Sequence, residues 1–137
     1  MIRFEIKGRP VPWKRLRRNG NAYFPAAGQV EAKDAVRKAF AEAAPSGFTG
    51  PSDRAVEVTI HAVFALPMRP GRRRAGDPHI MKPDGDNIAK LVKDALSGLA
   101  YKDDCQVSRT VVKKQWSDHD RTSVTVEYMD PYRGRAS

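Results

Sequence analysis

Six aspartates are concentrated in one part of an otherwise basic chain. Between residues 77 and 104 six acids face four bases, a net charge of −2, so the remaining residues carry +11 and the whole chain +9. Carboxylates can hold a divalent cation at a phosphodiester bond, and a basic surface can gather the surrounding phosphates. This charge distribution is what a metal-dependent nuclease needs. The acids are Asp77, Asp84, Asp86, Asp94, Asp103 and Asp104, and the bases are Lys82, Lys90, Lys93 and Lys102.

The spacing of the acids limits which of them could bind the same metal ion. Asp84 and Asp86 lie two residues apart just before a segment with helical periodicity, where both side chains can point the same way and the helix dipole favours negative charge. Lys90 follows Asp86 by four residues, one turn along the same face. Asp94 lies about 12 Å beyond Asp86 along the axis, too far for both to ligate one ion at roughly 2.0–2.6 Å. We therefore expect Asp94 to pair with Lys90.

The second acidic pair precedes a segment with the pattern of a strand, which could return beside the start of the helix. Neighbouring strand residues face opposite sides, so only one of Asp103 and Asp104 is expected to reach a metal, and spacing does not say which. A plainer interpretation gives these acids a role in shaping the chain. Asp84-Gly85 suits a turn, Asp86 suits a helix N-cap, and the second pair suits a solvated turn. Spacing alone leaves both interpretations open.

Hydrophobic periodicity supplies the elements that must position these residues. The expected elements are, in chain order, a strand at 2–7, a helix at 29–44, a strand at 55–66, a helix at 86–99, and strands at 106–113 and 122–128. The last two strands are expected to form a hairpin around a polar turn at 118–120, and long loops are expected at 8–28 and 68–85. The order β-α-β-α-β-β predicts a single α+β domain with a mixed sheet and two packed helices. We expect it to span residues 1–130, with a mobile tail at 131–137.

The apolar stripes of these elements predict the core. The first helix offers five residues, the long strand six and the second helix six. They are Ala32, Val36, Ala39, Phe40 and Ala43; Val56, Val58, Ile60, Ala62, Phe64 and Leu66; and Ile88, Leu91, Val92, Ala95, Leu96 and Leu99.

Eight basic residues are concentrated in the two expected loops. They are Lys14, Arg15, Arg17 and Arg18 in the first, and Arg69, Arg72, Arg73 and Arg74 in the second. We expect them to contact backbone phosphates, which positions DNA without reading its sequence; the alternative is a solvated basic surface. Trp13 lies beside the first group and either stacks on an unpaired base or caps the core.

The composition of the chain limits the class of protein to which it can belong. A chain of 137 residues with 40% hydrophobic and 30% charged residues fits one globular domain, and a pI near 10.0 favours a polyanionic partner. A single cysteine excludes an internal disulfide and makes a cytoplasmic location the expectation. Neither a spanning segment nor the apolar centre of a secretion signal is evident. The three histidines and Cys105 form no zinc pattern; we expect His61 to be a satisfied sheet histidine and Cys105 a small buried filler.

The acidic region resembles one known family. Its pattern is Asp-x-Asp-Asn-x-x-Lys-x-x-x-Asp-Ala-Leu followed by Asp-Asp-x-Gln-Val, and residues 84–96 and 103–107 match every position. This is similar to the RusA family of Holliday junction resolvases. An arginine-rich stretch before the motif is shared in character, although residues 75–83 here separate it from the first aspartate. The specific resemblance covers roughly residues 82–107, and the remainder fits loosely.

The resemblance implies a small dimeric DNA endonuclease, often of prophage origin, that depends on Mg²⁺, with Mn²⁺ as a possible substitute. Such enzymes cut two opposed strands of a four-way junction in DNA recombination and repair. The metal-binding acids carry over to Asp84, Asp86 and Asp104, and the essential lysine to Lys90. Asp103 is then a neighbouring acid. The resemblance therefore favours Asp104 over Asp103 and the metal-site interpretation over the turn-and-cap one.

Two other functions fit parts of the sequence. A related metal nuclease acting on flaps or replication forks would use the same acids. A non-catalytic DNA-binding module would use the basic loops alone, but phosphate binding has no use for clustered acids. The complete set of Asp84, Asp86, Lys90 and Asp104 favours the nucleases.

Overall fold

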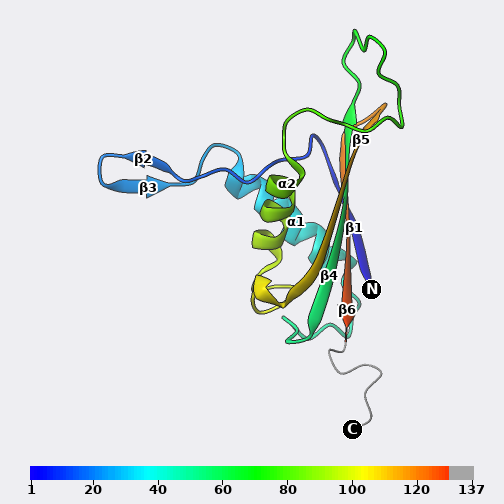
Figure 1. Cartoon of the computed structure of the whole chain (residues 1–137). Helices are drawn as coiled ribbons and strands as arrows, with labels where there is room; N and C mark the ends of the chain where they lie inside the picture. Colours follow the sequence, from blue (N-terminus) through cyan, green and yellow to red (C-terminus); the bar gives the residue numbers. More distant parts are fainter. Residues whose placement is uncertain (130–137) are drawn as a thin grey trace.

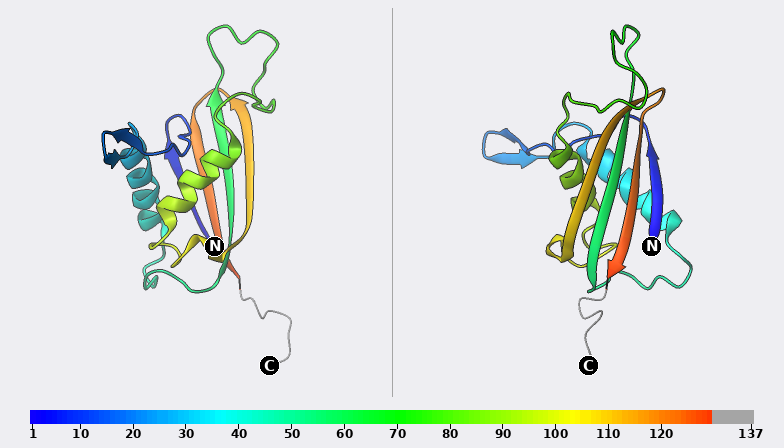
Figure 2. Two further views of the ribbon diagram at one scale, coloured as in Figure 1. Left: turned by 60° about the vertical axis from the view of Figure 1, so that its left-hand side comes forward. Right: turned by 45° about the vertical axis from the view of Figure 1, so that its right-hand side comes forward.

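The protein, described here from a computed structural model, is a two-layer α+β domain. The structure describes residues 1–129, so the expected tail at 131–137 lies outside the described residues. Both helices pack on one face of a four-stranded sheet (Figures 1 and 2). In chain order the elements are β1 (Ile2–Lys7), β2 (Arg17–Asn19), β3 (Ala22–Phe24), α1 (Gln29–Ala43), β4 (Ala55–Ala65), α2 (Gly85–Leu96), the 3-10 turn η1 (Asp104–Gln106), β5 (Val107–Ser117) and β6 (Arg121–Met129).

The strand order is β1-β6-β4-β5, which corrects the expected hairpin between the last two strands. Although β5 and β6 are joined by a short turn, β4 lies between them, parallel to β5 and antiparallel to β6. A parallel pair requires a crossover connection, and α2 provides it between β4 and β5. With one edge of β4 occupied by β5, the next strand pairs with the other edge. The turn passes over the end of β4, where the Asp120 carboxylate accepts a hydrogen bond from the Ala65 N–H at 2.8 Å.

The core lies between this sheet and the helices. All five expected residues of β4 from Val56 to Phe64 are fully buried, and Leu66 is half-buried just past the strand. On the helical side Val36 and Phe40 of α1 are buried, and Phe40 makes edge contacts with Phe4 and Phe48. Each such side chain contributes about 1.5–3 kcal/mol on full burial. One hydrophobic core thus joins the sheet to both helices.

Helix α1 has nearly the expected bounds. It begins at Gln29 and ends at Ala43, before Pro45. The predicted apolar face is correct except at its last residue, because Ala43 is exposed and Ala44 packs against the core instead.

Helix α2 begins one residue before the expected start and ends three residues earlier than expected. Its last residue is Leu96, and Gly98 adopts a φ of +84°, a conformation that glycine accommodates easily. Leu99 therefore lies outside the helix, yet it is half-buried against the core. The hydroxyl of Tyr101, which is fully buried, donates a hydrogen bond to the Lys93 carbonyl at 2.8 Å and so stabilises this end of the helix.

The expected loop at 8–28 contains a β-hairpin formed by β2 and β3. Arg17 pairs with Phe24 and Asn19 with Ala22, which leaves a two-residue turn. Gly20 opens this turn with a φ of +62°. All six strand residues are exposed, and the hairpin projects to one side of the domain (Figure 1). The turn dipeptide Gly20-Asn21 was the sequence signal for it.

The connection between β4 and α2 extends past the end of the sheet (Figure 1). Its second half returns along β5: Trp116 donates its N–H to the Asp77 carbonyl at 2.8 Å, and His79 donates to Lys114 at 3.1 Å. The Lys114 ammonium donates to the carbonyls of Met81 at 2.6 Å and Pro83 at 2.7 Å. These contacts fix the chain immediately before Asp84. In the described part of the chain no helix is both long and apolar enough to cross a bilayer.

Candidate active site

An open cavity of about 710 Å³ lies between α2, β5 and η1. Residues from all three elements line it: Asp84, Gly85, Asp86, Ala89, Lys90, Lys93, Asp94, Asp104, Thr110 and Val112. All four residues of the predicted catalytic set are among them. We call it the acidic cavity.

Asp84 and Asp86 enter the cavity from the start of α2. Asp84 is the N-cap residue of the helix, but its side chain makes no capping hydrogen bond, and Asp86 lies in the first turn. The turn-and-cap interpretation had Asp86 as the N-cap, so it is wrong on the capping residue. Both aspartates are exposed. Their carboxylates remain available to a ligand in the cavity.

Asp103 and Asp104 take different positions. Asp103 is the N-cap residue of η1, and its carboxylate accepts a hydrogen bond from the Cys105 N–H at 2.9 Å, which lowers its pKa. Asp104 lines the cavity, whereas Asp103 does not. A hydrogen bond with Asp103, together with some burial and the negative charges of Asp103 and Asp94, raises the pKa of Asp104. Of these two carboxylates, the one that lines the cavity is therefore the one whose ionised form is disfavoured.

Gln106 secures this acidic turn to the rest of the domain. Its side-chain oxygen accepts hydrogen bonds from the N–H groups of Lys102 and Asp103, both at 2.9 Å. Its side-chain nitrogen donates to the carbonyls of Ser52 at 2.8 Å and Arg54 at 2.9 Å. One amide therefore connects the turn to the segment before β4. The sequence offered Gln106 only as a motif position, without this role.

Lys90 does not pair with Asp94 as expected. Within residues 1–129 the ion pairs are those of His119 with Asp118 and Arg121 with Glu5. The Lys90 ammonium instead lies over the ring of Trp13, 3.5 Å from its centroid. Trp13 is half-buried against the core, which agrees with the core-capping alternative. Asp94 lines the acidic cavity one turn beyond Lys90.

The donor set of the cavity fits a hard divalent cation. Carboxylate oxygens are the ligands that Mg²⁺ and Ca²⁺ prefer, and crowded negative charge is what a cation would relieve. As the side chains stand, no three His, Cys, Asp or Glu residues within residues 1–129 are close enough together to ligate one ion. The three exposed aspartates that would do so, Asp84, Asp86 and Asp104, share one cavity.

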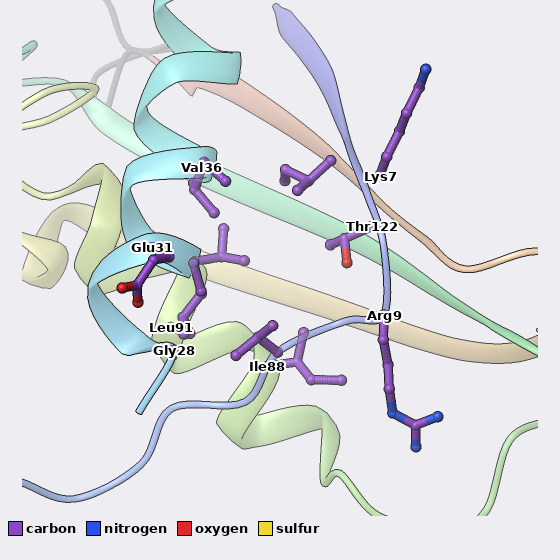
Figure 3. Close-up of a pocket in the computed structure, with 13 residues that line it drawn as sticks. Lys7, Arg9, Gly28, Glu31, Val36, Ile88, Leu91 and Thr122 are labelled. Atoms are coloured by element: carbon purple, nitrogen blue, oxygen red, sulfur yellow. The ribbon is translucent and has the colours of Figure 1, made fainter. Parts of the chain in front are cut away.

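A second cavity, of about 270 Å³, lies on the other side of α2 between α1 and β1. Figure 3 shows Val36, Ile88 and Leu91 around it, with the charged ends of Lys7 and Arg9 directed away. Within residues 1–129, Glu31 is the one acidic residue that lines this second cavity, and the second cavity shares no lining residue with the acidic cavity. The clustered carboxylates are therefore in the acidic cavity.

The predicted DNA-contacting residues lie in two projecting parts. Arg17 and Arg18 are on strand β2, just after Lys14 and Arg15, and all four are exposed. In the β4–α2 connection Arg69, Arg72 and Arg74 are exposed. Arg73 differs: its Nε donates to the Pro70 carbonyl at 2.8 Å, and its guanidinium lies 5.2 Å from the Trp116 ring centroid. Arg73 therefore stabilises the connection itself.

The remaining histidines and the cysteine lie outside the acidic cavity. His61 is bonded to Gln115 at 2.9 Å, as expected of a sheet histidine. His79 is buried between Phe64 and Trp116. Cys105 is exposed, so the expectation of a buried filler is wrong. It lies in η1, whose residues are held by capping rather than by burial.

Comparison with known proteins agrees with the motif. The family model described as Endodeoxyribonuclease RusA matches residues 6–127. The chain is also 31% identical over 134 residues to a protein of Bacillus subtilis (strain 168) described as Uncharacterized protein YqaN, covering 91% of this chain and 94% of that protein. The chain belongs to the RusA family of endodeoxyribonucleases. The match extends the resemblance from the motif to nearly the whole domain.

Proposed function

We propose that this protein is a metal-dependent endonuclease that resolves four-way DNA junctions by hydrolysing phosphodiester bonds. One observation carries the proposal: Asp84, Asp86, Lys90 and Asp104 line a single cavity in a chain of this family. Residues from two ends of the motif, separated by a helix, converge there. No packing requirement accounts for three exposed carboxylates on one cavity of a basic protein.

Asp84, Asp86 and Asp104 would hold the divalent cation, Mg²⁺ or Mn²⁺. When bound, such an ion lowers the pKa of a water and withdraws charge from phosphoryl oxygens. The aspartates would hold it between α2 and β5, which approach each other closely where Gly85 faces Val112. Gln106 holds Asp104 in place through its four hydrogen bonds.

Lys90 supplies a positive charge at the same cavity. An ammonium there favours the extra negative charge that develops on the phosphoryl oxygens in the transition state. Because Lys90 makes no ion pair within residues 1–129, that charge is not neutralised by a neighbouring carboxylate. The lysine can therefore act on the phosphate rather than on an aspartate.

The two projecting basic parts would bind the duplex arms. The residues are Lys14, Arg15, Arg17 and Arg18 at the hairpin, and Arg69, Arg72 and Arg74 in the β4–α2 connection. They lie on different sides of the domain (Figure 2), as contacts to two arms of branched DNA would require. Such contacts position the phosphate backbone.

A four-way junction has two opposed strands to cut, and one chain carries a single acidic cavity. A two-fold symmetric homodimer would present two cavities with the approximate symmetry of the junction. We propose this assembly and a cytoplasmic location. The same site could serve a nuclease acting on flaps or forks, whereas a non-catalytic binding module would leave the carboxylates without a purpose.

Cleavage of labelled substrates tests the proposal. The protein is incubated with a four-way junction, a flap, a fork and a linear duplex, with Mg²⁺ or with EDTA. We expect paired cuts in the junction that require the metal and little cutting of the duplex. Preferred cutting of the flap or fork would favour the related nuclease, and binding without cutting in Mg²⁺ or Mn²⁺ would contradict catalysis.

A further inference from the structure

The contact between Lys90 and Trp13 joins the acidic cavity to a distant part of the chain. The ammonium lies 3.5 Å from the ring centroid, close enough for the negative face of the ring to attract it. Among residues 1–129 the Lys90 ammonium makes no hydrogen bond and no ion pair. The ring is therefore the group that fixes the end of this side chain.

Trp13 is itself firmly placed. Its backbone N–H donates to the carbonyl of Asn87 at 2.8 Å, one turn before Lys90 on α2. Its side chain packs against the hydrophobic core and lines a neighbouring cavity that shares Asp84 with the acidic cavity. The ring thus contacts the lysine and lines a cavity that one of the aspartates also lines.

Gln29 holds the segment on either side of Trp13. This first residue of α1 is only 4% exposed. Its side-chain nitrogen donates to the Pro12 carbonyl and its oxygen accepts from the Lys14 N–H, both at 2.9 Å. A buried amide with both groups bonded leaves the segment 12–14 little freedom. The position of the ring is therefore imposed by α1 as well as by α2.

We propose that Trp13 is a positioning residue for Lys90, and that Gln29 supports it. The inference rests on the proposed function. A carboxylate partner would fix the ammonium but would also neutralise it, whereas the uncharged ring fixes it and leaves its full charge for the phosphate. Asp94, four residues from Lys90 on the same helix, makes no such pair. One face of Trp13 is occupied by the ammonium, so the ring acts through the lysine rather than by stacking that face on a base.

Nuclear magnetic resonance tests the contact without relying on activity. Protons above an aromatic face are shifted upfield by the ring current. The Lys90 ε-methylene resonance is assigned by its loss in Lys90→Arg. In the intact protein we expect this resonance to lie upfield of the ε-methylene resonances of the other lysines. Trp13→Leu should return it to the common position. An ordinary Lys90 resonance in the unsubstituted protein would overturn the contact.

Single-turnover cleavage at saturating protein then tests the role. A displaced catalytic group can cost roughly a hundredfold in rate, so we expect Trp13→Leu to slow cleavage roughly ten- to a hundredfold with junction affinity nearly unchanged. Trp13→Phe, which keeps an aromatic face, should lose only about threefold. Gln29→Ala should slow cleavage in the same direction as Trp13→Leu and reduce the upfield shift.

Fluorinated tryptophans at position 13 keep the ring's shape while weakening its negative face, so they remain informative if Trp13→Leu does not fold. We expect the cleavage rate to fall as fluorine is added. Fluorinated phenylalanine at Phe40, a fully buried core residue whose ring packs edge-on against Phe4 and Phe48, is the control and should leave the rate unchanged. Equal rates throughout the position-13 series would overturn the positioning role. Failure of the proposed function is seen separately, as no cleavage by the unsubstituted protein.

Discussion

Gly85 lies so close to Val112 that a β-carbon at position 85 would stand 3.3 Å from Val112 Cγ1. Gly85 separates Asp84 from Asp86, and Val112 lies on β5, which forms the opposite wall of the acidic cavity. The absence of a side chain at this position therefore sets how near the helix start approaches the sheet. Its backbone φ is not in the left-handed region, so close approach is the constraint.

The substitution Gly85→Ala tests this spacing. A methyl group would move α2 and Val112 apart by a few tenths of an ångström, while alanine's better helix propensity offsets part of the cost by up to about 1 kcal/mol. We expect the free energy of unfolding to change by less than about 1 kcal/mol and single-turnover cleavage to fall roughly tenfold. Urea titration and cleavage assays on the same preparation measure both. Unchanged cleavage would mean that the spacing is not critical.

Gln106→Ala should weaken the domain and the site together. The substitution removes four hydrogen bonds, one of them part-buried and three exposed, and we expect a loss of about 2 kcal/mol in the free energy of unfolding. Ser108→Ala, two residues further along the chain in β5, is the control, because the Ser108 hydroxyl makes one long contact of 3.4 Å with the Val56 carbonyl. It should cost under about 0.5 kcal/mol. Equal losses would contradict the role of Gln106.

His79 should make stability depend on pH. Burial, followed by the charges of Lys114 and Arg9, lowers the pKa of His79 below its ordinary value of 6.5. The unfolded chain then binds a proton that the folded protein does not, so stability decreases as pH falls below about 6.5. We expect His79→Phe to flatten the slope of unfolding free energy between about pH 7 and pH 5. An unaltered slope in His79→Phe would show that another group titrates.

Salt dependence of junction binding tests the two basic parts. Affinity should fall with a log–log slope of about −0.9 for each phosphate neutralised on duplex arms. We expect Arg72→Ala with Arg74→Ala to make the slope less steep by up to about 1.8, and Arg17→Ala with Arg18→Ala to do the same. Arg3→Ala with Arg37→Ala removes equal charge from β1 and α1 and should leave it unchanged. If the control pair has the same effect as the other two, only net charge matters.

The sequence predicted the elements whose signal is local. The alternation of β4 and the apolar stripes of the helices gave their bounds to within a few residues, because each pattern reports burial of a continuous face. Strand order depends on pairing between distant segments, which periodicity does not encode. The order β4–α2–β5 is nevertheless typical of a crossover connection, which places β5 beside β4. The Gly20-Asn21 turn also has a local sequence signal.

The candidate site was predictable to the extent that it lies in one motif. Asp84, Asp86, Lys90 and Asp104 were identified, and the structure places all four at one cavity. The contact of Lys90 with Trp13 was not predicted. An (i, i+4) ion pair is a local expectation, whereas Trp13 lies 77 residues away in the chain. The exposure of Cys105 and the bonding of Gln106 also depend on how η1 packs, which no local pattern describes.

The most direct test compares two adjacent aspartates. Asp104→Asn removes a carboxylate that lines the acidic cavity, whereas Asp103→Asn alters its neighbour, whose carboxylate caps η1. In single-turnover cleavage of a four-way junction with Mg²⁺, Asp104→Asn should abolish cutting while junction binding is retained, as should Asp84→Asn and Asp86→Asn. Asp103→Asn and Asp94→Asn should cut more slowly but measurably. Cleavage by Asp104→Asn at the unsubstituted rate would contradict a metal site formed by Asp84, Asp86 and Asp104.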